Sequence, residues 1–176
     1  MTGTDTALIL IDIQNDYFTG GKNPLVGAEA AVQVAKQVLD KAREKRHAIF
    51  HVQHVSLHPG ATFFLPDTPG AEIHPLLTPR EGETVVVKHS PSSFRETSLL
   101  ADLQAREIKR LFLCGMMTHM CVDTTVRVAA DLGFDCTLIG AATATKDLVY
   151  DGETVPARQV QAAFLSALQG AFAKVI

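Results

Sequence analysis

Short apolar runs rich in β-branched residues alternate along this chain with segments whose apolar residues recur at helical spacing. The alternation is typical of βαβ units, in which parallel strands form a sheet and helices cover it. We expect helices over about residues 28–42, from about 97, after 121 and from about 156 to 170. Six runs are predicted to be strands, at about residues 7–11, 48–52, 84–87, 111–114, 136–139 and 172–176. The sequence therefore predicts an α/β fold with three α/β/α layers and a six-stranded parallel sheet.

The length and charge of the chain indicate how many domains it forms and which kinds of partner it is suited to. A chain of 176 residues with 47% hydrophobic content suffices for one domain with a two-faced core, so we expect a single domain over residues 1–176. The net charge of -3, without a basic stripe, argues against nucleic acid as a partner. No targeting segment and no membrane-length apolar run is evident, which favours a cytoplasmic protein without a membrane partner. The three cysteines form no Cys-x-x-Cys motif and are expected to be free.

Three chemically reactive side chains follow predicted strands. Asp12 follows the first strand, Lys88 follows the third, and Cys121 comes one turn after the fourth. Ligands of open parallel sheets bind beyond the carboxyl ends of the strands, so we expect these side chains to share one edge. Taken singly, each residue has an ordinary structural role: Asp12 would cap a loop, Lys88 would be a solvated strand end and Cys121 an inert, buried thiol. Together they form a nucleophile set in which Asp12 accepts the thiol proton and Lys88 favours both anions.

The segment around Cys121 predicts how its thiol is activated. Thr118 is a suitable N-cap for a helix after the fourth strand, which places Cys121 in the first helical turn. Unpaired amides and the helix dipole favour a thiolate there. We therefore expect a thiol pKa lowered from about 8.5 towards the working pH.

The segment 54–83 fits neither strand nor helix spacing. It is rich in proline and histidine and carries Phe63, Phe64 and Leu65, which are costly to leave in water. This excursion is expected to form a pocket wall or a subunit contact.

Three segments resemble the motifs of a known family, the isochorismatase-like cysteine hydrolases, which include nicotinamidases, N-carbamoylsarcosine amidases and ureidoacrylate amidohydrolases. Residues 12–18 resemble its aspartate motif, 88–94 its lysine motif and 115–121 its cysteine motif. The resemblance implies a Rossmann-like fold with strand order 3-2-1-4-5-6. It also implies a catalytic triad of Asp12, Lys88 and Cys121 and a covalent acyl-enzyme.

The same resemblance implies an oxyanion hole and departs from one family pattern. A cis peptide between Met116 and Met117 would turn the amide of Met117 beside that of Cys121. Nicotinamidases of the family carry an Asp-x-His metal motif after the second strand, where this chain has His54, Val55 and Ser56. We therefore expect no metal. The alternative, a site formed by the histidines at 51, 54 and 58, is weakened because they run from a strand into a loop.

The expected activity is hydrolysis of a C-N bond in a small amide or carbamoyl compound, without a cofactor or a metal. Alternatives are isochorismatase-type vinyl-ether hydrolysis, a non-catalytic scaffold and a thiol-based redox sensor. Apolar residues in the excursion also suggest a homo-oligomer, as a dimer or a tetramer. The residues predicted to contact the small-molecule substrate are Gln14, Phe18, His54, Phe64, Phe94 and His119.

Overall fold

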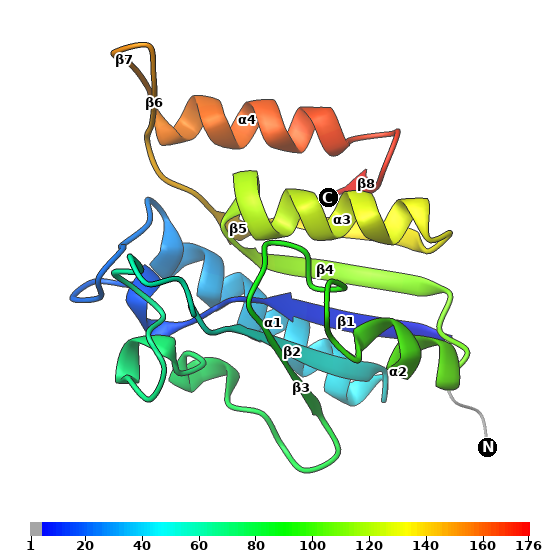
Figure 1. Cartoon of the computed structure of the whole chain (residues 1–176). Helices are drawn as coiled ribbons and strands as arrows, with labels where there is room; N and C mark the ends of the chain where they lie inside the picture. The colour runs from blue at the N-terminus through cyan, green and yellow to red at the C-terminus, as the bar shows by residue number, and fades with distance from the viewer. Residues whose placement is uncertain (1–4) are drawn as a thin grey trace.

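The computed structural model describes residues 5–176 and contains a six-stranded sheet in the order β3-β2-β1-β4-β5-β8 (Figure 1). Every neighbouring pair in this sheet is parallel. The predicted fold class and strand order are therefore confirmed. The strands of the sheet are β1 (Thr6–Ile11), β2 (Ala48–His54), β3 (Thr84–Lys88), β4 (Arg110–Met116), β5 (Asp135–Ala144) and β8 (Lys174–Val175).

Helices cover both faces of the sheet and create two separate apolar cores. One core lies under α1, and the other lies under α2, α3 and α4. Among residues 5–176, no helix is both long enough and apolar enough to cross a bilayer. The helices are α1 (Ala28–Glu44), α2 (Leu99–Ala105), α3 (Asp123–Asp131) and α4 (Ala157–Leu168).

The two longest helices differ in how well their buried faces follow the sequence pattern. In α1 the predicted apolar positions are buried, apart from Val38, which is partly buried against the same core. In α4, Val160 and Leu168 are buried, but the predicted contacts of Ala163 and Ala167 are wrong because both residues are exposed. Both residues are exposed because α4 lies at the border of the sheet, where it packs beside α3 and the short strand β8 (Figure 1).

The C-terminal third departs from the predicted boundaries. Strand β8 is shorter than the predicted strand 172–176, because the N–H of Phe172 still bonds to the carbonyl of Leu168 and keeps the chain coiled. Strand β5 extends beyond the predicted 136–139 to Ala144. A hairpin that was not predicted, β6 (Leu148–Tyr150) with β7 (Glu153–Val155), projects from the body of the molecule (Figure 1).

The excursion 54–83 folds back over the carboxyl end of the sheet and is partly built into the core. It contains two short 3-10 turns, η2 (Pro69–Ala71) and η3 (Pro75–Leu77). The side chains of Phe64 and Leu77 are buried in the α1 core, whereas Leu65 is 37% exposed. A backbone bridge joins Gln14 to Ile73, so the excursion lies against the loop that follows β1.

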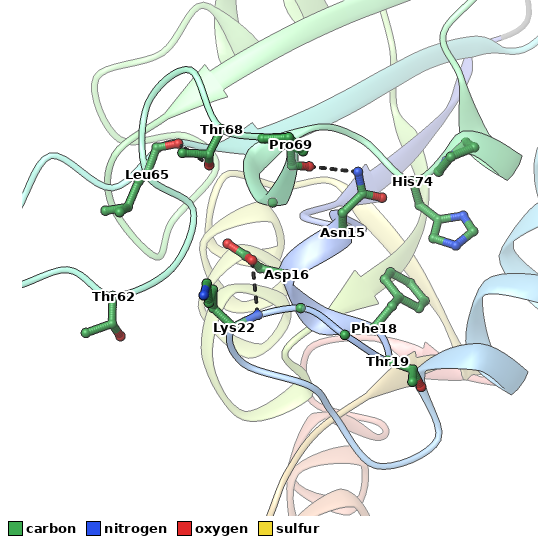
Figure 2. A pocket seen from close by; sticks show the side chains of 14 residues that line it. Asn15, Asp16, Phe18, Thr19, Lys22, Thr62, Leu65, Thr68, Pro69 and His74 are labelled. Atoms are coloured by element: carbon green, nitrogen blue, oxygen red, sulfur yellow. Dashed lines mark hydrogen bonds between the residues drawn. The ribbon is translucent and has the colours of Figure 1, made fainter.

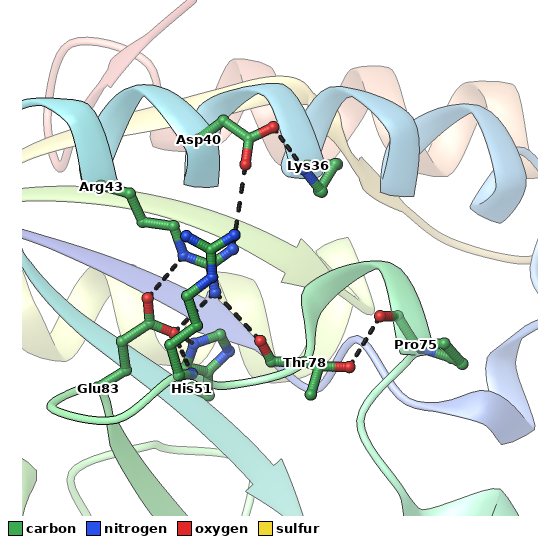
Figure 3. A network of polar contacts seen from close by, with 8 residues as sticks. Lys36, Asp40, Arg43, His51, Pro75, Thr78 and Glu83 are labelled. Atoms are coloured by element: carbon green, nitrogen blue, oxygen red, sulfur yellow. Dashed lines mark hydrogen bonds and ion pairs between the residues drawn. The ribbon is translucent and has the colours of Figure 1, made fainter.

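A partly buried polar network anchors the other end of the excursion (Figure 3). Glu83 accepts two hydrogen bonds from Arg43 of α1, at 2.7 and 2.9 Å, and lies 2.8 Å from His51 Nε2 of β2. Burial alone would raise the pKa of Glu83, but hydrogen bonds from Arg43, the Arg80 amide and His51 outweigh it and lower that pKa to about 2. The network fixes the start of β3, and therefore the position of the residue that ends it.

Candidate active site

The side chains of Asp12, Lys88 and Cys121 meet at the carboxyl edge of the sheet. Asp12 follows β1, Lys88 is the last residue of β3, and Cys121 lies in the turn after β4. The Lys88 Nζ is 2.8 Å from Asp12 Oδ2, and both side chains are fully buried. One carboxylate oxygen of Asp12, one ring nitrogen of His54 and Cys121 Sγ all lie within 4.8 Å of one another. A carboxylate, an ammonium, an imidazole and a thiol therefore share one site.

Backbone geometry at the ends of β1 and β4 allows this convergence. Asp12 has a positive φ of 50°, and its N–H donates to the carbonyl of Val52 at 3.0 Å, which turns its side chain out of the strand direction. Gly115 has a φ of 136°, and a Cβ at this position would lie 2.0 Å from the carbonyl oxygen of Ile11. Only glycine permits this close approach of β4 to β1.

Lys88 has an acceptor for each of its three ammonium protons. Its Nζ lies 2.8 Å from Asp12 Oδ2, 2.9 Å from His54 Nδ1 and 2.9 Å from the carbonyl oxygen of Ser90. The other oxygen of Asp12, Oδ1, is also buried, and the Cys121 thiol is a hydrogen-bond partner of this carboxylate. That oxygen is available to accept a proton from the neighbouring thiol or from a bound molecule.

The turn that carries Cys121 differs from the predicted helix start. Residues Thr118–Val122 form a π-helical turn, η4, ahead of α3, and the Met116–Met117 peptide is cis. The prediction that Thr118 caps the helix is wrong, because its hydroxyl bonds instead to the carbonyl of Ala144 at 3.1 Å and to Gln161 Oε1 at 2.7 Å. These contacts tie the turn to β5 and α4.

The predicted activation of Cys121 by a lowered pKa is also wrong. Burial, and secondarily the negative charge of Asp12, raise the pKa of the Cys121 thiol, and Lys88 offsets this only in part. Burial also raises the pKa of Asp12, against the opposing effect of Lys88. The ammonium requires one anion beside it, and a carboxyl group is more acidic than a thiol. The resting site therefore holds the Asp12 carboxylate, the Lys88 ammonium and a neutral Cys121 thiol.

Two of the predicted substrate contacts lie next to this cluster. The ring of His54 is held at Nδ1 by Lys88, and its backbone is held by Gln14. The Gln14 side chain is fully buried and bonds to three backbone groups, at 2.7 to 2.8 Å. Gln14 therefore fixes β2 and the excursion in place, and direct contact between Gln14 and a substrate stays a prediction.

The remaining predicted contacts are more dispersed. The Phe64 ring lies 6.0 Å from the His54 ring, between centroids, on the wall formed by the excursion. Phe94 packs on the second core, which includes Cys121, and His119 Nδ1 bonds to the hydroxyl of Thr145 at 2.6 Å. A role in substrate contact stays a prediction for these three residues.

Phe18 lines a cavity of about 620 Å³ between residues 15–22 and 62–75 (Figure 2). Its ring faces that of His74, with centroids 4.3 Å apart. Asp16 forms the inner wall, where its carboxylate accepts hydrogen bonds from the amides of Lys22 at 3.1 Å and Phe64 at 2.7 Å. None of the three side chains Asp12, Lys88 and Cys121 lines this cavity, so the cavity is separate from their cluster.

Tyr17 is a site residue that sequence reasoning missed. It is 2% exposed, and its ring packs edge-on against Phe64 with centroids 4.6 Å apart. Burial and the nearby groups of Cys121 and Asp12 raise the pKa of its hydroxyl well above the ordinary value. The sequence signal that could have identified Tyr17 is its position within the aspartate motif, residues 12–18. In the structure a 3-10 turn, η1 (Asn15–Tyr17), directs this segment back towards the sheet.

A metal ion fits this site poorly. Within residues 5–176, the group with suitable spacing for an ion is Asp12, His54 and Cys121. The Lys88 ammonium already contacts the first two, so a divalent cation would face a buried positive charge. The other two histidines of the sequence pattern point elsewhere, His51 to Glu83 and His58 to the amide of Gly60.

Comparison with known proteins identifies relatives along nearly the whole chain. The family model described as "Isochorismatase domain" matches residues 6–176. The isochorismatase family protein YddQ of Bacillus subtilis is 47% identical over 170 residues, which cover 97% of this chain and 94% of that protein. The crystal structure of a candidate isochorismatase hydrolase from Oleispira antarctica superimposes with a TM-score of 0.94 at 50% identity, covering 99% of this chain and 95% of that one.

Two further relatives carry the names of reactions. A streptothricin hydrolase of Streptomyces noursei is 34% identical over 154 residues, which cover 86% of this chain and 55% of that protein. The nicotinamidase of Escherichia coli is 29% identical over 170 residues, covering 76% of this chain and 80% of that protein. From the domain match and the YddQ identity together, the chain belongs to the isochorismatase family of hydrolases.

Proposed function

We propose that this protein is a metal-independent cysteine hydrolase that cleaves a C-N bond of a small amide or carbamoyl compound. The observation that carries the proposal is the buried contact of Asp12 and Lys88 beside the Cys121 thiol. A fully buried carboxylate is costly to maintain in a core, so its presence beside a thiol supports a chemical role.

The first half of the reaction uses Asp12 as the general base. As the substrate carbonyl approaches, Cys121 Sγ transfers its proton to Asp12 Oδ1, and the sulfur forms a bond to the carbonyl carbon. Asp12 then returns the proton to the leaving nitrogen, the C-N bond breaks, and an amine or ammonia departs. The raised pKa of the thiol makes this transfer substrate-dependent, since the resting site favours a neutral thiol.

The second half of the reaction restores the free site. Water gives a proton to Asp12 and attacks the thioester carbon. The C-S bond then breaks, the sulfur takes the proton back, and a carboxylic acid is released. Throughout both halves Lys88 keeps its positive charge beside Asp12, which limits the net charge buried in the site. The amides of Met117 and Cys121 are the proposed oxyanion donors during both attacks.

The relatives favour amide chemistry over the alternatives. Nicotinamidase, by its name, hydrolyses an amide, and the thiol at the nucleophile position suits that reaction. Vinyl-ether hydrolysis is the second candidate, because it needs an acid and no thiol. Burial raises the pKa of Asp12, which favours its protonated, acidic form and is compatible with this reaction.

A redox sensor is disfavoured by the positions of the other thiols. Cys136 pairs in register with Leu111, five residues before the end of β4, which corresponds to about 16 Å along the strand. Cys114 belongs to the core on the opposite face of the sheet from Cys121. A disulfide requires Cα atoms within about 7 Å. Neither thiol is therefore placed to resolve an oxidised Cys121.

The test is a screen of small primary amides, N-acyl amines and carbamoyl compounds for release of ammonia or amine. The proposal predicts hydrolysis that survives dialysis against a chelator and is lost in Cys121→Ala. Activity that persists in Cys121→Ala would refute the covalent route, and hydrolysis of a vinyl ether by that variant would establish the second candidate. Loss of activity on metal removal, restored by added metal, would refute metal independence.

A further inference from the structure

His54 is held more rigidly than a pocket wall requires. The Gln14 side chain donates to the His54 carbonyl at 2.8 Å and accepts from the His54 amide at 2.7 Å, so both backbone groups are fixed by one buried amide. The ring is fixed separately by the contact between Nδ1 and Lys88 Nζ at 2.9 Å. This arrangement sets the direction of the second ring nitrogen, Nε2.

The contact with Lys88 decides which ring nitrogen carries the proton. An ammonium has three protons and no lone pair, and the three neighbours of Lys88 are all acceptors. His54 Nδ1 must therefore accept, which leaves the proton of a neutral ring on Nε2. Burial, followed by the charges of Lys88 and His89, lowers the pKa of His54 to about 4, so the neutral ring prevails near neutral pH.

The Nε2–H has no hydrogen-bond partner within residues 5–176, although the ring belongs to the catalytic cluster. His54 is partly exposed, whereas Asp12 and Lys88 are fully buried. Of the polar side chains that meet at the cluster, His54 thus combines partial exposure with a donor that no protein group within residues 5–176 uses. A donor held in place without a protein partner is suited to an acceptor on a bound molecule.

We propose that His54 recognises the substrate through its Nε2–H, and that the site selects small amides carrying a second hydrogen-bond acceptor next to the scissile carbonyl. This inference rests on the proposed hydrolase function. The acceptor is an ether or carbonyl oxygen or a ring nitrogen on the acyl part. An isostere with CH or CH₂ at that place would cover the Nε2–H without offering it an acceptor, so the site rejects it.

The first experiment measures the tautomer and binding without catalysis. Long-range ¹H–¹⁵N correlation spectra of the Cys121→Ser variant at neutral pH should show His54 protonated at Nε2 and unprotonated at Nδ1. Two pairs of probes are then titrated, methoxyacetamide against butyramide and pyridine-2-carboxamide against benzamide. The acceptor-bearing member should bind about tenfold more tightly and shift the Nε2 resonance. A proton on Nδ1, or equal or absent binding by both members of each pair, overturns the inference.

Two substitutions separate substrate recognition from support of Lys88. In His54→Asn the amide oxygen takes the place of Nδ1 and can still accept from Lys88, but nothing replaces Nε2. In His54→Gln the amide nitrogen takes the place of Nε2. We expect His54→Asn to lose the preference for acceptor-bearing probes and His54→Gln to keep part of it, while His58→Asn, an exposed control, behaves as wild type.

The outcomes distinguish this inference from the proposed function. If His54→Asn keeps the full preference for acceptor-bearing probes, the inference is overturned. It is also overturned if the preference is lost only together with a fall in melting temperature, since His54 would then have a structural role. Hydrolysis of both members of each pair at equal kcat/KM by wild type would also overturn it and leave the hydrolase function intact. Selective binding by Cys121→Ser, without hydrolysis of any probe by wild type, would support recognition by His54 and refute the amide chemistry.

Discussion

Removing the charge of Lys88 should destabilise the fold strongly. In Lys88→Met the Asp12 carboxylate remains in a fully buried place, and its Oδ2 loses the ammonium at 2.8 Å. The Cys121 thiol would then be the remaining hydrogen-bond partner of this buried carboxylate within residues 5–176. Breaking a buried pair in this way costs ~3 to 5 kcal/mol, a large part of the ~5 to 15 kcal/mol that stabilises a typical domain. The variant should still fold, with a much lower urea midpoint.

The double variant Asp12→Asn, Lys88→Met provides the matched control. It removes both charges together, and asparagine tolerates the positive φ at position 12. Replacing a whole buried pair by neutral groups is often nearly neutral, so we expect stability within ~1 kcal/mol of wild type. The two substitutions should therefore be strongly non-additive.

The stability of Lys88→Met should also depend on pH. In Lys88→Met the pKa of Asp12 is raised further by burial without its counter-charge, so the native state binds a proton that the unfolded state has released. Stability of this variant should fall as pH rises, and its deficit relative to wild type should be larger at about pH 8 than at about pH 5. Urea denaturation followed by circular dichroism measures both quantities. Additive effects, or a deficit independent of pH, would refute the reasoning.

Three further predictions concern other parts of the fold. Glu83, whose pKa is lowered to about 2, contributes stability that is present above its unfolded value of about 4.5 and lost as pH falls towards 2, ~3 kcal/mol in all. Acid titration of Glu83→Gln by circular dichroism should lack this loss, and an unchanged titration would contradict it. Gln161→Ala removes one of the two hydrogen bonds of Thr118 in the turn of Cys121, and should lower kcat/KM about tenfold with little change in melting temperature. Exposed Gln159→Ala should not, and equal effects of the two would assign Gln161 no positioning role. Gly70→Ala would place a Cβ 2.2 Å from Asp16 Oδ1 and should lower the free energy of unfolding, measured by urea denaturation, by ~1 to 3 kcal/mol. Gly60→Ala should be tolerated, because its Cβ would meet only the His58 ring, at 3.4 Å. Equal stability of the two variants would contradict the packing at Asp16.

The convergence of Asp12, Lys88 and Cys121 could be predicted because it depends on topology alone. Parallel strands carry their carboxyl ends to one edge, and each of the three residues follows a clear apolar run. The protonation of Cys121 could not be predicted in the same way. A helix dipole is a local property of the chain, but the desolvation that raises the thiol pKa comes from residues far away in the sequence.

Other differences have equally specific causes. The tautomer of His54 depends on a contact with Lys88, 34 positions away, that no local pattern encodes. The exposure of α4 reflects its position at the border of the sheet, although its apolar spacing resembles that of a buried helix. The β6–β7 hairpin did leave a signal, because Asp151 and Gly152 form a two-residue turn between two short stretches, Leu148–Tyr150 and Glu153–Val155. The short length of both strands concealed it.

The most direct test of the proposed chemistry is to trap the covalent intermediate. Wild-type protein mixed with an amide that it hydrolyses, and quenched with acid during turnover, should gain the mass of the acyl group, and peptide mapping should place that mass on Cys121. The adduct should be absent from Cys121→Ala and should disappear on treatment with hydroxylamine, as expected of a thioester. Steady turnover without any acyl adduct, together with activity retained in Cys121→Ala, would contradict nucleophilic catalysis by this thiol.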